Sequence, residues 1–107
     1  MTEQQVIRQV SLLVNNNPIE IEYFVQEFIY HVISGMMEML EGAGPVKTLE
    51  LYIDGDRVKI VHNGNAIAIN PFVTKIIRGT VTGMVSSLKG VSDIKTVNIS
   101  INKASKL

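Results

Sequence analysis

The sequence predicts an α+β fold in the order ααβββαβ, in which helices cover one face of a four-stranded mixed sheet. Two observations support this prediction. Apolar residues recur at a helical period in the first 41 residues and again after residue 70, whereas they alternate with polar residues in 48–69 and 96–101. The chain has 107 residues, of which 46% are hydrophobic, so it has the size and the apolar content of one folded domain.

We therefore expect a single domain over residues 1–107, without an internal repeat. Its expected parts are a helical hairpin at 1–41, a βββαβ unit at 46–101 and a polar tail at 102–107.

The first two segments are predicted to be helices. The stretch from Thr2 to Val14 has apolar residues at helical spacing, and three asparagines and Pro18 then interrupt the chain. A second, longer helix is expected from Asn17 to Glu41, because Asn17 is a suitable N-cap and Pro18 suits the first helical position, which needs no N–H group. The two helices should form an antiparallel hairpin or a sharp elbow.

The long helix is more apolar than one contact requires. Its apolar residues spread over an arc of roughly 220°, whereas an ordinary surface helix buries a stripe nearer 100° wide. The remaining sector is polar, and there His31 follows Glu27 by four residues, a spacing that predicts a solvated ion pair. Some of the apolar arc should stay open for a second copy of the chain. The predicted dimer contacts are Val32, Ile33, Met36, Met37 and Met39.

Three strands should follow as a meander. Asp54-Gly55 is a two-residue hairpin signal, and a turn there pairs Leu51 with Val58 and Leu49 with Ile60. Asn63-Gly64 repeats the signal and pairs Ile60 with Ile67. All these residues lie on one apolar face, which a helix must cover.

The last two elements are a helix and a strand. Asn70 and Pro71 form a cap-plus-proline start for a helix that reaches Lys89, and Gly79 and Gly83 on its apolar edge predict close packing against the sheet. The alternating segment 97–101 should be a fourth strand, parallel to the third because the chain returns through a helix, and placed beside either the first or the third strand.

The formal net charge is zero, but the two halves have opposite charge. Residues 1–56 hold two basic and nine acidic residues, and residues 57–107 hold eight basic residues and one acid. This pattern fits mutual neutralisation within one fold, an anionic partner that contacts Lys75, Arg78 and Lys89, or head-to-tail self-association. Nucleic acid is not the expected partner, because the pI is 6.7 and only Tyr52 offers an aromatic ring off the apolar face.

Few residues have the spacing that catalysis or metal binding needs. There is no cysteine, Asp54-Gly55-Asp56 lacks the later ligands of a calcium loop, and His31 and His62 belong to no catalytic motif. No metal, cofactor or catalytic residue is therefore predicted. The N-terminus lacks a basic leader and no apolar run could span a membrane, so we expect a soluble cytoplasmic protein; in a eukaryote the final Ser105-Lys106-Leu107 would be a peroxisomal address.

One segment resembles a known family. From Asn65 to Ile101 the chain has a strand, an amphipathic helix opened by Asn70 and Pro71, then Gly90 and an alternating strand. This order resembles the C-terminal part of the bacterial alkaline shock protein family, although Gly90 and Val97 are one residue further apart and the helix is basic where that family's is acidic. The resemblance implies a small α+β protein linked to envelope stress, without assigned catalytic residues.

Three functions follow from these observations. The leading hypothesis is a non-catalytic homodimeric interaction or scaffold module. The second is a protein, binding or catalytic, that holds a small anion at a helix N-terminus, at Asn70 or Asn17, where backbone N–H groups are free. The third is nucleic-acid binding through the basic C-terminal half.

Overall fold

The computed structural model describes residues 5–41 and 46–106, and of residues 5–8, 41 and 103–106 it describes the backbone alone. This part of the chain forms six strands and two helices. They are β1 (Gln5–Val14), β2 (Asn17–Ile19), α1 (Tyr23–Glu41), β3 (Thr48–Asp54), β4 (Arg57–His62), β5 (Asn65–Ala66), α2 (Pro71–Ser86) and β6 (Thr96–Lys106).

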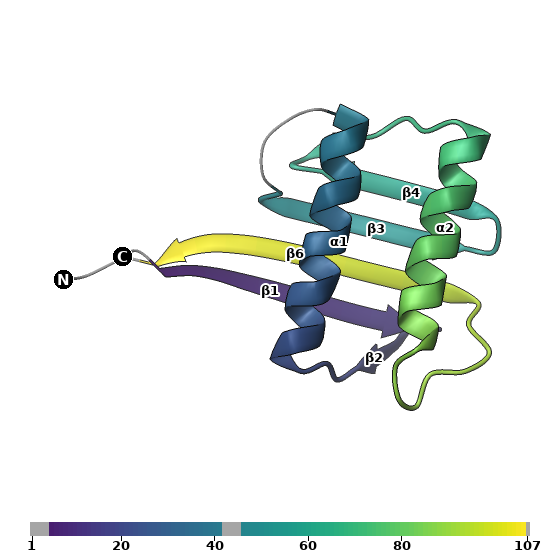
Figure 1. Cartoon of the computed structure of the whole chain (residues 1–107), viewed down its shortest axis with the longest axis horizontal. Coiled ribbons are helices and arrows are strands. Elements are labelled where there is room, and N and C mark those ends of the chain that lie inside the picture. Colours follow the sequence, from purple (N-terminus) through teal and green to yellow (C-terminus); the bar gives the residue numbers. More distant parts are fainter. Residues whose placement is uncertain (1–4, 42–45, 107) are drawn as a thin grey trace.

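All six strands belong to one antiparallel sheet in the order β2-β1-β6-β3-β4-β5. Both helices lie on the same face of this sheet and run across its strands (Figure 1). The Cα atoms span only 17 Å along the shortest axis, as expected for one sheet and one helix layer. The predicted α+β class with helices on one face is confirmed, whereas the four-stranded mixed sheet is wrong.

The first predicted helix is in fact strand β1. Val10, Leu12 and Val14 are buried, Gln9 and Ser11 are exposed and Leu13 is half-buried, which is the period of two that a half-buried strand shows. A short apolar run fits either period, and the deciding factor is the partner strand β6, which pairs with β1 along its whole length. The proposed cap Thr2 lies outside the described residues.

The long helix begins later than predicted, at Tyr23 rather than at Asn17. Asn15 and Asn16 have φ values of 52° and 67°, so they form a two-residue hairpin turn with two left-handed residues, and Asn17 pairs with Val14 in β2. Pro18 lies in this three-residue edge strand, where a missing N–H group is tolerated. The predicted helical hairpin is therefore a β-hairpin followed by one helix.

The predicted meander β3-β4-β5 is confirmed, with one change of register. Leu51 pairs with Ile60, two residues from the predicted partner, because Gly55 rather than Asp54 is the first turn residue, with a φ of +59° that suits glycine. The shift by two keeps the same side chains on the apolar face. The second register is as predicted, with His62 opposite Asn65, although β5 has only two residues.

Strand β6 lies between β1 and β3 and is antiparallel to both, so the predicted parallel return is wrong. The handedness rule that predicted it assumes a helix that runs back along the strands, whereas α2 runs across them (Figure 1). Strand β6 lies beside β3, the first strand of the meander, and this is one of the two positions that the sequence predicted for it. The predicted polar tail is the end of β6, as far as Lys106.

The chain consists of two copies of one ββαβ unit. Residues 10–54 and 58–102 align without a gap at a constant separation of 48 residues, with 15 identities in 45 pairs, and the elements β1-β2-α1-β3 and β4-β5-α2-β6 correspond one to one. The identities include Asn15/Asn63, Ile21/Ile69, Phe24/Phe72, Val25/Val73, Ile29/Ile77, Gly35/Gly83, Met36/Met84, Lys47/Lys95 and Thr48/Thr96. The expectation of no internal repeat is wrong. We call residues 10–54 the first repeat and residues 58–102 the second repeat.

The sheet shows that the repeats are interleaved about a pseudo-two-fold axis. Its strand order reads the same from either edge when each strand is replaced by its equivalent. At the centre β3 pairs with β6, and there Leu51 lies opposite its own equivalent, Ile99. Each of these strands also pairs with the first strand of the other repeat, so neither repeat closes a sheet alone.

Two asparagines repeat the same contacts on opposite sides of this axis. The side-chain Oδ1 of Asn15 accepts hydrogen bonds from the backbone N–H groups of Lys95 and Thr96, at 2.7 and 3.0 Å. The Oδ1 of Asn63 accepts from Lys47 and Thr48, at 2.8 and 3.0 Å. Each asparagine therefore fixes the start of the third strand of the other repeat.

Candidate functional site

The side of the helix layer that faces away from the sheet carries large apolar side chains. The exposed fractions are 73% for Phe24, 49% for Phe28, 85% for Met39, 69% for Phe72 and 48% for Ile76. The helices bury other residues against the sheet, among them Ile33 and Val81, which are fully covered. We call the exposed side the outer helix face; its members are Phe24, Phe28, Gly35 and Met39 of α1 and Phe72, Ile76, Gly79 and Gly83 of α2.

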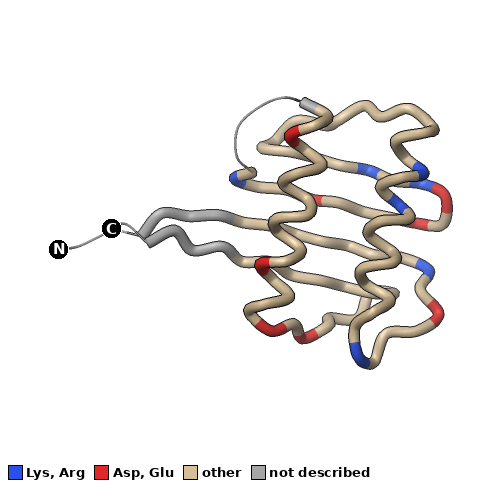
Figure 2. Tube along the Cα trace, in the orientation of Figure 1, with Lys and Arg blue, Asp and Glu red and all other residues tan. Residues whose placement is uncertain are grey.

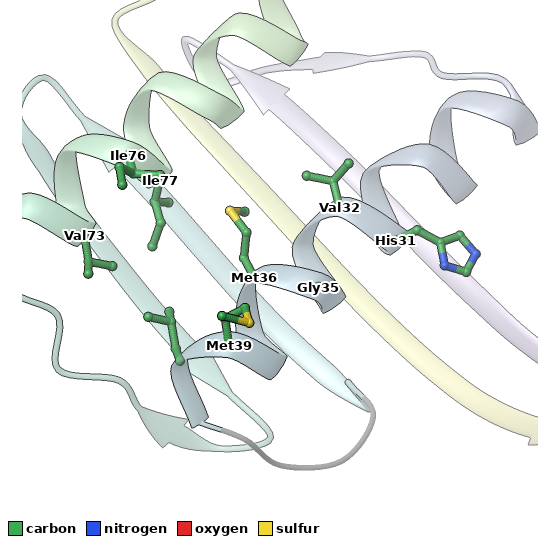
Figure 3. Close-up of a pocket in the computed structure, with 9 residues that line it drawn as sticks. His31, Val32, Gly35, Met36, Met39, Val73, Ile76 and Ile77 are labelled. Carbon is green, nitrogen blue, oxygen red and sulfur yellow. The ribbon is translucent and has the colours of Figure 1, made fainter.

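Between the two helices this face sinks into an apolar groove with two cavities of about 510 Å³ each. The first is lined by Val32, Met36, Met39, Val73, Ile76 and Ile77, with Gly35, Leu40 and His31 around them. Figure 3 shows Met36 of α1 and Ile77 and Val73 of α2 between the helices, whereas His31 points away from α2. The second cavity is lined by Phe24, Val25, Phe28, Ile29, Val32, Thr80, Met84, Ser87 and Leu88.

The two cavities are equivalent under the internal repeat. Val73, Ile76 and Ile77 in the first correspond to Val25, Phe28 and Ile29 in the second, and Met36 and Leu40 correspond to Met84 and Leu88. Val32 lines both cavities, so they form one groove that crosses the pseudo-two-fold axis. The groove is thus a property of both repeats, not a local irregularity of packing.

The five predicted dimer contacts fall into two groups. Val32, Met36 and Met39 line the groove, and Met39 is 85% exposed. Ile33 and Met37 are 0% and 1% exposed and lie in the core between helix and sheet, so they offer no surface to another chain. Helical spacing predicted an apolar arc but not which part of it the sheet would cover.

Sequence reasoning missed Phe24, Phe28, Phe72 and Ile76 as surface residues. Phe24 and Phe28 lie in the apolar arc of α1 and their rings stack, with centroids 6.2 Å apart. The sequence does contain a signal for this surface, because Phe24 and Phe72 are identical at equivalent positions. Helix geometry places Phe24 roughly 140° around α1 from the core residue Ile29, and Phe72 equally far around α2 from the core residue Ile77. The comparison of the two repeats therefore points to the outer helix face.

The glycines of α2 do not pack against the sheet as predicted. Gly79 and Gly83 are exposed, and a Cβ atom added at either would meet no heavy atom within 4 Å. The same holds for Gly35, the equivalent of Gly83 in α1. These residues leave shallow parts in the outer helix face beside its phenylalanines.

The predicted basic contact is not one patch. Lys75 and Arg78 lie one turn apart on α2, and the Arg78 Nη1 atom is 3.3 Å from Asp56 Oδ1, whereas Lys89 lies beyond the other end of this helix. A shallow depression lined by Asp56, Pro71, Thr74, Lys75 and Arg78 includes this acid together with the two cations.

The N-terminus of α2 is capped as predicted, which leaves little for an anion to bind. The N–H of Val73 donates to Asn70 Oδ1 at 2.8 Å, the N–H of Thr74 donates to the backbone O of Asn70 at 2.9 Å, and Pro71 has no N–H group. Asn17, the other proposed anion site, lies in β2 and begins no helix.

The two histidines occupy different environments. The Nε2 atom of His31 is 3.6 Å from Glu27 Oε1 with 67% of its side chain exposed, which confirms the predicted surface pair. His62 is only 2% exposed and takes the core position that Val14 has in the first repeat. Among the residues whose side chains the structure describes, no three His, Asp or Glu are grouped so that they could hold a metal ion.

No protein-family model matches the chain, and no curated protein or solved structure shows significant similarity to it. The resemblance of Asn65–Ile101 to the alkaline shock protein family stays a prediction. In the described part of the chain neither helix is long and apolar enough to span a bilayer. The cytoplasmic and peroxisomal locations also stay predictions, and Leu107, the last residue of the peroxisomal address, is not among the described residues.

Proposed function

We propose that this protein is a non-catalytic homodimeric interaction module, in which two copies associate through their outer helix faces. The observation behind this proposal is the exposure of five large apolar side chains, from 48% to 85%, around one continuous groove. A contiguous exposed apolar surface on a small protein usually marks an interaction site, and aromatic side chains are typical anchors of such sites.

A second copy fits this face because the face is pseudo-symmetric. The N-terminal half of each helix presents bulky residues, Phe24 and Phe28 or Phe72 and Ile76, and the C-terminal half presents a glycine, Gly35 or Gly83. A two-fold dimer packs the same patch of both copies together. The patch must therefore contain both bulky side chains and shallow parts that can receive them. The groove supports binding rather than catalysis, since its lining is apolar apart from His31, Thr80 and Ser87.

The experiment is the mass in solution by light scattering over a concentration series. The wild type should be a dimer, against a chain mass of 11.8 kDa. Phe28→Glu should give a folded monomer, because Phe28 is half exposed and the chain does not need it in the core. A mass of one chain for the wild type at high micromolar concentration would refute the proposal.

The matched control is Tyr52→Glu on the uncovered face of the sheet, where Tyr52 is 37% exposed. It introduces the same charge in place of another partly exposed ring and should leave the dimer intact. Loss of the dimer in this control as well would mean that added charge, and not the outer helix face, is responsible.

A further inference from the structure

The two helices share the charge difference between the two halves of the chain. Helix α1 contains Glu27, Glu38 and Glu41 and no lysine or arginine, whereas α2 contains Lys75 and Arg78 and no acid. Glu27 is the equivalent of Lys75, and Glu41 is the equivalent of Lys89, so the sign reverses at equivalent positions. Figure 2 shows the acidic residues around α1 and basic residues along α2.

These charges lie beside the groove and not within it. Glu27 and Glu38 are roughly 160–180° around α1 from the groove residue Met36, and Lys75 and Arg78 are roughly 140–160° around α2 from the groove residue Val73. Glu38 and Lys75 are also exposed. The outer helix face therefore has an acidic flank beyond α1 and a basic flank beyond α2.

Two helix layers can face each other about either of two axes. An axis parallel to the helices places α1 of each copy on α2 of the other, and an axis across the helices places α1 on α1 and α2 on α2. In both arrangements the facing helices are antiparallel. The N-terminal half of one helix, with Phe28 or Ile76, therefore meets the C-terminal half of the helix that faces it, with Gly83 or Gly35. Phe24/Phe72, Phe28/Ile76 and Gly35/Gly83 keep bulky and small residues at equivalent positions, so the shape at these positions does not choose between the two arrangements.

The charged flanks distinguish between the two dimer axes. An axis parallel to the helices brings the acidic flank of one copy over the basic flank of the other, twice, whereas the other axis brings acid over acid and base over base. We propose that the dimer axis runs parallel to the helices, with α1 of each copy packed on α2 of its partner copy and the acidic flank facing the basic flank. This inference rests on the proposed function, and like-charge contacts are a common means of excluding the wrong arrangement.

The first test is the salt dependence of the wild-type dimer. Raising sodium chloride from about 50 mM to about 500 mM screens the flanks and should weaken the dimer several-fold. An axis across the helices predicts the opposite sign, because screening would then relieve repulsion. A dimer that tightens with salt therefore overturns the arrangement while it leaves the proposed function intact, and a wild-type monomer at every salt concentration refutes the proposed function itself.

The second test reverses one flank at a time. Glu27→Lys with Glu38→Lys makes the acidic flank basic, and Lys75→Glu with Ser86→Glu makes the basic flank acidic without disturbing the contact of Arg78 with Asp56. At low salt each variant alone should bind itself at least about tenfold more weakly than the wild type, and an equimolar mixture of the two should form a heterodimer of near wild-type affinity. Circular dichroism and thermal melting should show that each variant is folded.

The controls place reversed charges on the open sheet face, with Glu50→Lys and Lys59→Glu, and should leave the dissociation constant unchanged. Undiminished self-association of both flank variants would contradict the arrangement, since an axis across the helices keeps like charges together whatever their sign. A mixture that binds no better than its components would contradict it as well.

Discussion

The two repeats differ mainly where they face solvent. Most equivalent positions in the core, part of the groove and the turn asparagines keep the same or a similar residue, as Leu51/Ile99, Met36/Met84 and Asn15/Asn63 show. Surface positions beside the groove have changed, and Glu27 has become Lys75. Folding constrains the first set equally in both copies, because the pseudo-two-fold axis gives equivalent residues equivalent neighbours. The second set is not constrained by folding, and its reversed charges are the basis of the proposed dimer axis.

The outer helix face adds a second lesson to this comparison. The open face of the sheet is polar, with Gln9, Ser11, Glu50, Lys59 and Asn102 exposed, as expected for a surface that faces water. The outer helix face is equally uncovered but keeps Phe24 and Phe72 in both repeats. Packing against the sheet does not explain apolar residues on that side, whereas the proposed dimer would cover them.

The largest expected effect tests whether the two repeats share one core. Leu51 and Ile99 are 0% exposed and pair with each other at the pseudo-two-fold axis. Leu51→Asp and Ile99→Asp should each lower the free energy of unfolding by several kcal/mol, because each buries an unpaired carboxylate between sheet and helices. Urea denaturation measures this.

A suitable control is Glu50→Ala, one residue away on the open face. Glu50 Oε1 accepts a hydrogen bond from Ser100 Oγ at 2.7 Å in an exposed position, so its loss should cost less than about 1 kcal/mol. If only one of the two aspartate variants were strongly destabilised, the repeats would not be equivalent at the axis.

A smaller effect is expected at the two turns. Asn15→Ala and Asn63→Ala should each cost about 2–3 kcal/mol, because each removes the side-chain acceptor of two backbone N–H groups and places alanine at a positive φ, 52° or 51°. The two costs should agree within about 1 kcal/mol, as judged by urea denaturation. Asn15→Gly and Asn63→Gly tolerate the positive φ, so they measure the loss of the hydrogen bonds alone, and a glycine variant as stable as the wild type would show that those bonds contribute little.

The smallest effect concerns the glycines of the outer helix face. Gly35→Ala and Gly83→Ala should each raise the free energy of unfolding by up to about 1 kcal/mol, because alanine is the better helix former and the added Cβ meets no heavy atom within 4 Å. The measurement requires a protein concentration low enough for the monomer. A loss of stability under these conditions would mean that the glycines serve the fold of the single chain, contrary to the proposed dimer contact.

The sequence by itself determined the local features of the meander β3-β4-β5 and of the start of α2. Asn70 and Pro71 start α2, the Asn63-Gly64 turn sets the register of β4 with β5, and alternation placed Leu49 and Leu51 on the covered face. These features depend on neighbours in the chain, so short-range patterns were sufficient. The repeat itself was also present in the sequence, as a constant separation of 48 residues, but it was obscured when the first strand was interpreted as a helix.

Only the tertiary structure decided the long-range features. The segment of β1 is compatible with helix or strand, and β6, some 90 residues away, decides for the strand because it supplies hydrogen-bond partners along the whole length. The sheet and α2 likewise decide which part of the apolar arc of α1 is covered. Ile33 and Met37 pack against the sheet in the core, and α2 forms the other wall of the groove. Phe24 and Phe28 stay on the outer helix face. Helical spacing gives the width of an apolar arc, but which part of it is buried depends on the layer that packs against it.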